Sequence, residues 1–226
     1  MPRNLYLGID PSASAARDSG YCVINDSQRI ISIGKWRGFE ELAHILEPFK
    51  QQICIVGIDG PLQPPHELHR CCFTSEECHH EQNNSAPGRI CERLLIRRGY
   101  RCFLTSKNSF VKSWVLRCFD LKDFLSDLSC QIIEVFPYAT RKILFPDLHG
   151  KKQTREFRLN LQKHLKDRGI RLPEKEKPYS HDELDALLAA VTARLVDLRQ
   201  AERIGDERDG YIYIPLKISE DIITPL

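Results

Sequence analysis

Hydrophobic and polar residues alternate near the start of the chain as they do in a β-strand that is buried on one face. In residues 4–10, Leu5, Leu7 and Ile9 share one face, while Tyr6, Gly8 and Asp10 share the other. Two further runs, 20–25 and 29–36, are separated by a turn-rich DSQ, which predicts a hairpin. Continuous apolar runs at 53–59 and 130–137 suit buried parallel strands. The late run 211–215 also has the composition of a strand.

Helical spacing of apolar residues alternates with these runs. The pattern predicts a helix in 38–52, with Pro48 as an early end, and a second in 87–99, between Pro87 and Gly99. Further helices are predicted in 109–125, 154–169 and 180–200, of which the last has the strongest pattern. We therefore expect one domain over residues 1–226, with a Cys- and His-rich loop and helices inserted at 60–130.

Composition narrows the class of protein. The 226 residues are enough for one sizeable core, and the nine cysteines are odd in number and unevenly spaced, unlike a secreted disulfide framework. No run has the length of a membrane span and the start does not resemble a signal peptide, so we expect a cytoplasmic protein without a membrane partner. The net charge of +2 is too small to indicate a polyanion partner by itself.

Two apolar runs each end in Gly-Ile-Asp, at Asp10 and Asp59. The order of predicted elements is that of an RNase H-like domain, a mixed five-stranded sheet flanked by helices. In it the first three strands are antiparallel, and the fourth and fifth run parallel to the first. The first and fourth strands are neighbours, so the two carboxylates would emerge side by side. Gly8 and Gly57 would leave space for an ion or for the end of a helix. The alternative for either aspartate is a turn-capping role.

Three later acids are candidates for the same site. Glu134 interrupts an apolar strand, where a carboxylate needs a cation, an arginine partner or an exposed strand end. Asp182 and Asp185 lie three residues apart at the start of the last helix. Ser180 and Glu183 have the spacing of a capping box, which explains Glu183 without catalysis. The small residues Ala186, Ala189 and Ala193 would let this helix approach the sheet closely.

Such a cluster suits phosphodiester hydrolysis. Two divalent ions about 4 Å apart activate the attacking water and stabilise the leaving oxygen. Carboxylate oxygens are the ligands that Mg²⁺ and Mn²⁺ favour. The predicted metal ligands are Asp10, Asp59, Asp182 and Asp185, and Glu134 is a further catalytic candidate.

Several motifs together resemble a known family. They are GIDPS, GIDGPLQPP, RICERLL, IIEVFPYATRKIL, GKK, HDELDALLAAVTA and GYIYIP, in this order along nearly the whole chain. The combination resembles the domain-of-unknown-function 429 proteins, which implies an RNase H-like fold and a nuclease activity. The spacing of Asp182 and Asp185 is also similar to that of the bacterial Holliday-junction resolvases, in which strand acids matching Asp10 and Asp59 complete a metal site.

Two groups of residues suggest further binding sites. A structural Zn²⁺ is a candidate in the loop that follows the fourth strand, where the alternative is an exposed thiol-rich loop. The candidate zinc ligands in this loop are His66, His69, Cys71, Cys72, Cys78, His79 and His80. Arginines recur every four residues in one predicted helix, and two lysines lie together before another. These candidate phosphate contacts are Arg89, Arg93, Arg97, Lys151 and Lys152, and the alternative for each is a solvated face.

The sequence therefore predicts a nuclease or related phosphodiesterase that uses Mg²⁺ or Mn²⁺ on nucleic acid. A non-catalytic binding module for nucleic acid or protein is the first alternative. An ATPase-like protein that binds nucleotide phosphates in its Asp-containing loops is the second.

Overall fold

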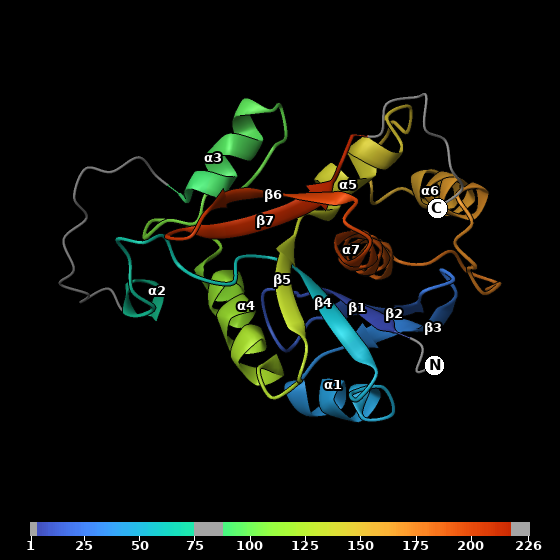
Figure 1. Cartoon of the computed structure of the whole chain (residues 1–226), viewed down its shortest axis with the longest axis horizontal. Helices are drawn as coiled ribbons and strands as arrows, with labels where there is room; N and C mark the ends of the chain where they lie inside the picture. Colours follow the sequence, from blue (N-terminus) through green and yellow to red (C-terminus); the bar gives the residue numbers. More distant parts are fainter. Residues whose placement is uncertain (1–3, 75–87, 218–226) are drawn as a thin grey trace.

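A computed structural model describes residues 4–74 and 88–217 of the chain. Within these residues, seven strands form one mixed sheet in the order β3-β2-β1-β4-β5-β7-β6 (Figure 1). The strands are β1 (Leu5–Asp10), β2 (Ser19–Asn25), β3 (Ile30–Trp36), β4 (Ile53–Asp59), β5 (Gln131–Val135), β6 (Ala201–Asp206) and β7 (Gly210–Pro215). The protein is thus α/β in class, with a mixed sheet flanked by helices, as predicted.

The first five strands have the predicted directions. β2 is antiparallel to β1 and to β3, while β4 is parallel to β1 and β5 is parallel to β4. The predicted count of five is wrong, because β7 extends the sheet parallel to β5 and β6 pairs antiparallel with β7. β6 lies at the edge of the sheet and only Ile204 in it is buried, so its sequence, AERIGD, lacks the apolar run of an inner strand.

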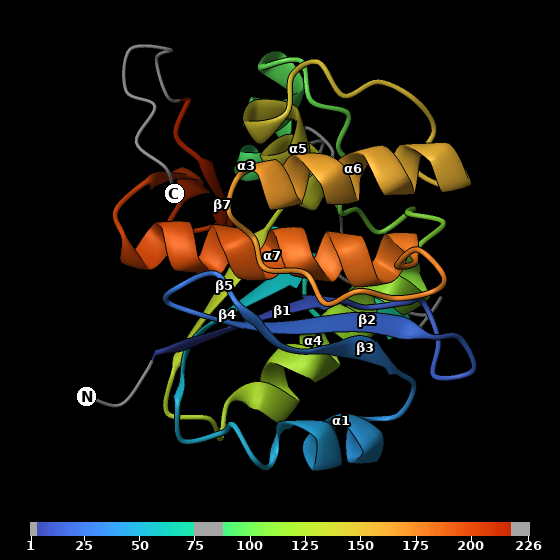
Figure 2. The same cartoon turned by 90° about the vertical axis from the view of Figure 1, so that its right-hand side faces the viewer.

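Helices cover both faces of the sheet (Figure 2). The described helices are α1 (Phe39–Leu46), α2 (Cys71–Thr74), α3 (Ile90–Arg97), α4 (Lys112–Leu125), α5 (Pro137–Leu144), α6 (Arg155–Asp167) and α7 (His181–Asp197). α6 and α7 lie on one side of the first strands, and α1 and α4 lie on the other. No helix in the described part of the chain is both long enough and apolar enough to cross a membrane.

Alternation along β1 divides the core into two layers. Tyr6 faces the cluster that holds the buried side of α7, whereas Leu7 and Ile9 face the cluster that holds Leu121 and Leu125 of α4. α4 is therefore part of the main core although it lies within the 60–130 segment. The description of that segment as an insertion in a single domain stays a prediction.

Glycines let α7 lie directly on the sheet. A Cβ atom added to Gly8 would stand closer than 3.0 Å to the backbone of Ala186 and Ala190. Gly57, which pairs with Gly8 in the parallel ladder, faces the carbonyl oxygen of Ala189 in the same way. The space at these glycines is therefore filled by the helix, one of the two occupants predicted from the sequence. The predicted small-residue face of α7 is confirmed.

Candidate metal centre

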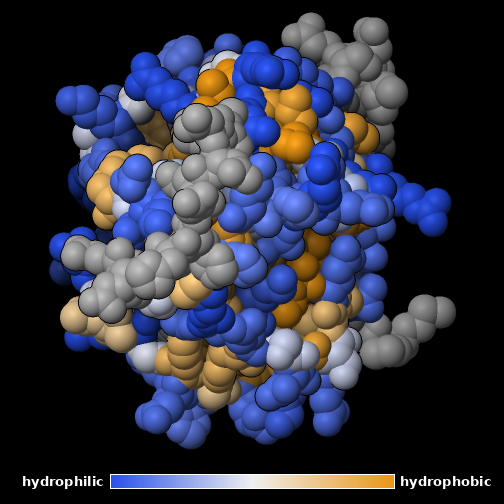
Figure 3. Space-filling model, turned by 90° about the vertical axis from the view of Figure 1, so that its left-hand side faces the viewer, coloured by the Kyte–Doolittle hydropathy of each residue, from blue (hydrophilic) through white to orange (hydrophobic). Residues whose placement is uncertain are grey.

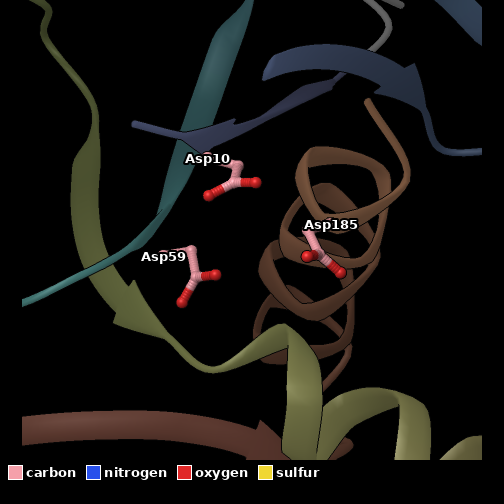
Figure 4. A group of neighbouring side chains, drawn as sticks. All are labelled: Asp10, Asp59 and Asp185. Carbon is pink, nitrogen blue, oxygen red and sulfur yellow. The ribbon is translucent and has the colours of Figure 1, made fainter. Parts of the chain in front are cut away.

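Adjacent parallel strands bring the first two carboxylates together. Asp10 is the last residue of β1 and Asp59 is the last residue of β4. The ladder between them pairs Gly8 with Gly57 and Ile9 with Ile58. The next residue of each strand is an aspartate, so both side chains leave the sheet at the same edge (Figure 4). This is the side-by-side placement that the two Gly-Ile-Asp motifs predict.

The third carboxylate comes from α7. Ser180 caps the helix by accepting a hydrogen bond from the Glu183 backbone N–H at 3.2 Å, and the Ser180 N–H donates to Glu183 Oε2 at 2.7 Å. This capping box, predicted from the sequence, starts the helix so that Asp185 faces Asp10 and Asp59 (Figure 4). One carboxylate oxygen from each of Asp10, Asp59 and Asp185 lies within 4.8 Å of the other two.

Carboxylates this close oppose one another's ionisation. Burial, followed by the charges of Asp59, Asp185 and Asp182, raises the pKa of Asp10 well above its usual range. Burial and the charge of Asp185 likewise raise the pKa of Asp59 to about 8. The carboxyl groups of this site therefore ionise together only when positive charge is nearby.

Lys152 supplies one positive charge. Its Nζ lies 2.8 Å from Asp185 Oδ2, and about half of its side chain is exposed. It lowers the pKa of both Asp10 and Asp59. The sequence singled out Lys152 as a phosphate contact and did not reveal this ion pair, because its partner lies 33 residues further along the chain.

The donor set suits a hard divalent cation. Three carboxylates offer oxygen ligands only, which favours Mg²⁺ or Mn²⁺ over Zn²⁺. Ligands on opposite sides of a Mg²⁺ ion are about 4.2 Å apart, because each bond is about 2.1 Å long. A group within 4.8 Å is thus close to the size that such an ion requires. The acidic group indicates the use of a divalent metal.

Asp182 lies next to this group without being part of it. Its Oδ1 is 3.1 Å from His181 Nε2, and it contributes less than Asp59 and Asp185 to the raised pKa of Asp10. It precedes Asp185 by one turn and remains one quarter exposed. Its predicted role as a metal ligand stays a prediction.

Glu134 has a different environment, the arginine partner considered from the sequence. Arg89 donates from Nη1 to Glu134 Oε2 at 2.7 Å and from Nη2 to Oε1 at 2.5 Å, and the Leu62 N–H also donates to Oε2. The Arg89 Nε donates in addition to Glu92 Oε1 at 2.8 Å. Glu134 is thus held in a buried ion-pair network, outside the group of three carboxylates.

The predicted arginine stripe is not a single exposed face. α3 begins at Ile90, so Arg89 precedes the helix and folds into the core, where only 1% of it is exposed. Arg93 is half-buried and donates to the Gly88 carbonyl oxygen at 2.5 Å, whereas Arg97 is exposed. Arg89 therefore has no surface for a phosphate contact. Lys151 is exposed beside Lys152.

The candidate zinc ligands are only partly described. Cys78, His79 and His80 lie outside the described residues. Cys72 is buried in α2 and accepts a hydrogen bond from the His69 N–H at 3.4 Å, while Cys71 is exposed. Within residues 4–74 and 88–217, the three aspartates are the one metal-sized group of acids, histidines and cysteines. The zinc site stays a prediction.

Comparison with known proteins gives one family match and one structural similarity. The model of a family described as "Protein of unknown function (DUF429)" matches residues 8–209. No curated protein matches the chain. The solved "Thermus thermophilus RuvC structure" is similar with a TM-score of 0.42 and 14% identity, over 86% of this chain and 96% of that one. A similarity at this level assigns neither a fold nor an activity to the chain.

Proposed function

The chain belongs to the DUF429 family, and from its three converging aspartates we propose that it is a metal-dependent nuclease with an RNase H-like core. The order and directions of the first five strands support this fold. The observation that carries the activity is the group of Asp10, Asp59 and Asp185, whose carboxylates lie within 4.8 Å of one another at the ends of two strands and on the helix that covers them.

Each side chain has a role in this proposal. Asp10, Asp59 and Asp185 would hold Mg²⁺ or Mn²⁺, and Asp182 would be an additional ligand from the preceding turn. Bound divalent ions activate a water for attack on a phosphodiester and stabilise the leaving oxygen. Lys152 pairs with Asp185, and its ammonium group would be available to a substrate phosphate if that carboxylate held a metal ion. Glu134 positions the loop after Asp59, because it accepts a hydrogen bond from the Leu62 N–H at 3.0 Å.

The substrate of the proposed reaction is nucleic acid. A phosphodiester is the bond that this arrangement of acids and hard ions cleaves in other enzymes. The exposed Lys151 and Arg97 supply positive charge for backbone contacts. Cleavage assays with each type of substrate decide whether the strand is DNA, RNA or a hybrid.

Cleavage of end-labelled substrates tests the activity. Single-stranded, duplex, hybrid and four-way branched substrates are incubated with Mg²⁺, with Mn²⁺ or with EDTA. Asp10→Asn and Asp185→Asn should each lower the cleavage rate by at least about 100-fold, because each removes a metal ligand that contributes several kcal/mol to the transition state. Asp127→Asn is the matched control, because Asp127 is exposed and precedes β5, at the opposite edge of the sheet from the acids.

Two results would contradict the proposal. One is cleavage that persists at the wild-type rate in both aspartate variants, and the other is the absence of cleavage by the wild-type protein with every substrate and both metals. The second would favour the non-catalytic binding module. One observation already suits that alternative, since Lys152 pairs with Asp185 at 2.8 Å.

A further inference from the structure

Two phenylalanines between α3 and α4 point into solvent. Phe103 is 62% exposed and Phe110 is 85% exposed, whereas the next most exposed large hydrophobic side chain of the described residues, Leu198, is 45% exposed. The two rings contact each other edge to face, with centroids 5.8 Å apart and planes at 77°. Folding usually buries phenylalanine, so an exposed pair indicates a surface that binds something.

The segment that carries the pair is strongly basic. The whole chain has 33 basic and 31 acidic residues, but residues 93–119 contain no aspartate or glutamate. The basic residues of this segment are Arg93, Arg97, Arg98, Arg101, Lys107, Lys112 and Arg117. Arg98 pairs with Glu202, and Arg101 is exposed two residues from Phe103. The aromatic pair is thus surrounded in sequence by the charge that attracts phosphates.

The segment also lies beside the acidic site. The indole N–H of Trp114 donates to the carbonyl oxygen of Pro11, the residue after Asp10, at 3.0 Å. An atom added at Gly60, the residue after Asp59, would stand 3.0 Å from the Trp114 ring. Phe110 comes just before α4, and Trp114 lies in the first turn of that helix. The face of the molecule that carries α2, α3 and α4 has hydrophobic patches among its hydrophilic side chains (Figure 3).

We propose that Phe103 and Phe110 form a stacking platform for unpaired bases of a single-stranded nucleic acid. The inference rests on the proposed nuclease function and adds a substrate class to it. Every base has a π-face that can lie on an exposed aromatic ring, and nearby cations hold the phosphates between bases. Bases within a duplex are already stacked on one another, so the platform favours single strands, loops or ends. A strand held there would pass toward the three aspartates.

Fluorescence anisotropy in EDTA tests the platform without cleavage. The probes are labelled single-stranded DNA and RNA of about 15 nucleotides, close to the upper site size of such surfaces, and a duplex of the same length. Phe103→Ala and Phe110→Ala should each weaken single-strand binding by at least about fivefold, because one ring contributes about that much per stacked base. Phe110→Trp should retain binding, since the larger ring also stacks. The DNA and RNA arms show which strand is preferred.

Controls separate stacking from charge and from folding. Leu198→Ala removes an exposed apolar side chain beyond the far end of α7, about 20 Å along the helix from Asp185, and should leave the affinity unchanged. The phenylalanine variants should keep the salt slope of binding, because they remove no phosphate contact. Circular dichroism confirms that each variant is folded.

Three binding outcomes would overturn the platform. They are an unchanged affinity in the double variant, an equal loss of duplex binding, and no measurable single-strand binding by the wild-type protein. Phenylalanine-dependent binding without metal-dependent cleavage would refute the nuclease and keep the platform. Cleavage that is independent of both rings would refute the platform and keep the nuclease.

Discussion

Replacing Gly8 with alanine should disrupt the contact on which the metal centre is built. The added Cβ atom would lie closer than 3.0 Å to the Ala186 carbonyl oxygen and the Ala190 nitrogen. Both obstacles are backbone atoms of a buried helix, so no side-chain rotation relieves the overlap. α7 must instead move away from the sheet by roughly 1 Å to restore ordinary contact distances.

The expected loss of stability follows from this displacement. Overpacking a core costs typically 1–3 kcal/mol, and a clash between two rigid elements belongs at or above the top of that range. Eleven residues of α7 are buried, so a shift of the helix weakens many contacts at once. We expect Gly8→Ala to lower the free energy of unfolding by about 3 kcal/mol or more, and the melting temperature by about 6–12 °C for a chain of this size.

A graded series of glycine variants makes the measurement specific. An atom added at Gly57 would stand 2.7 Å from the Ala189 carbonyl oxygen, a milder overlap, so Gly57→Ala should cost about 1–2 kcal/mol. An atom added at Gly38 meets nothing within 4 Å, and Gly38→Ala should stay within about 1 kcal/mol of the wild type, the range for a helix N-cap. Urea unfolding followed by circular dichroism gives the three values. Equal midpoints for Gly8→Ala and Gly38→Ala would refute the reasoning.

Further predictions concern the buried ion pair and the charges of the metal centre. Glu134→Gln removes a negative charge from beside the buried Arg89 and should lower the free energy of unfolding by about 3 kcal/mol. Glu202→Gln, in the exposed pair with Arg98, should lower it by at most about 1 kcal/mol. Equal urea midpoints for the two variants would contradict this. Mg²⁺ should raise the melting temperature of the wild type and not that of Asp59→Asn, since one ligand is lost. Because the pKa of Asp59 is raised to about 8, protons compete with the metal below that pH. Calorimetric Mg²⁺ affinity should therefore rise with pH up to about 8, by at most about tenfold per unit, and a pH-independent affinity would argue against Asp59 as a ligand. Lys152→Gln removes a competing cation and should tighten Mg²⁺ binding by up to about fivefold; weaker binding in the same titration would show that the lysine supports the metal.

Sequence patterns predicted the elements that have one clear apolar face. β1, β4 and α7 lie within a few residues of their expected bounds, because each buries a regular set of side chains. The pattern missed α2, α5 and β6. α5 begins at Pro137, where the apolar run predicted as a strand, 130–137, ends, so the pattern assigns the start of this helix to the strand. β6 is an edge strand that forms through its hairpin with β7, not through an apolar sequence of its own.

The acidic site was predictable for a topological reason. Parallel strands that are neighbours end at the same edge, so two aspartates in equivalent positions must meet there. The partners of Glu134 and Lys152 were not predictable in this way. Arg89 lies 45 residues from Glu134 in the sequence, and the two side chains meet only in the folded protein. Local spacing carries no information about ion pairs of this kind.

The position of Asp185 along α7 links the packing of the core to the chemistry of the site. Ala186 and Ala190 fix the height of the helix above β1 through their backbone contacts with Gly8. Asp185 immediately precedes Ala186, so its carboxylate is carried to the ends of β1 and β4 by the same contact. Asp182 lies one turn earlier, about 4.5 Å along the axis, where its backbone packs against Gly20 of β2 instead. The helix can thus place one of its two aspartates against both strand ends. In Gly8→Ala, a shift of α7 that relieved the overlap with the added Cβ atom would separate Asp185 from Asp10. The metal centre therefore requires the glycine as much as it requires the acids.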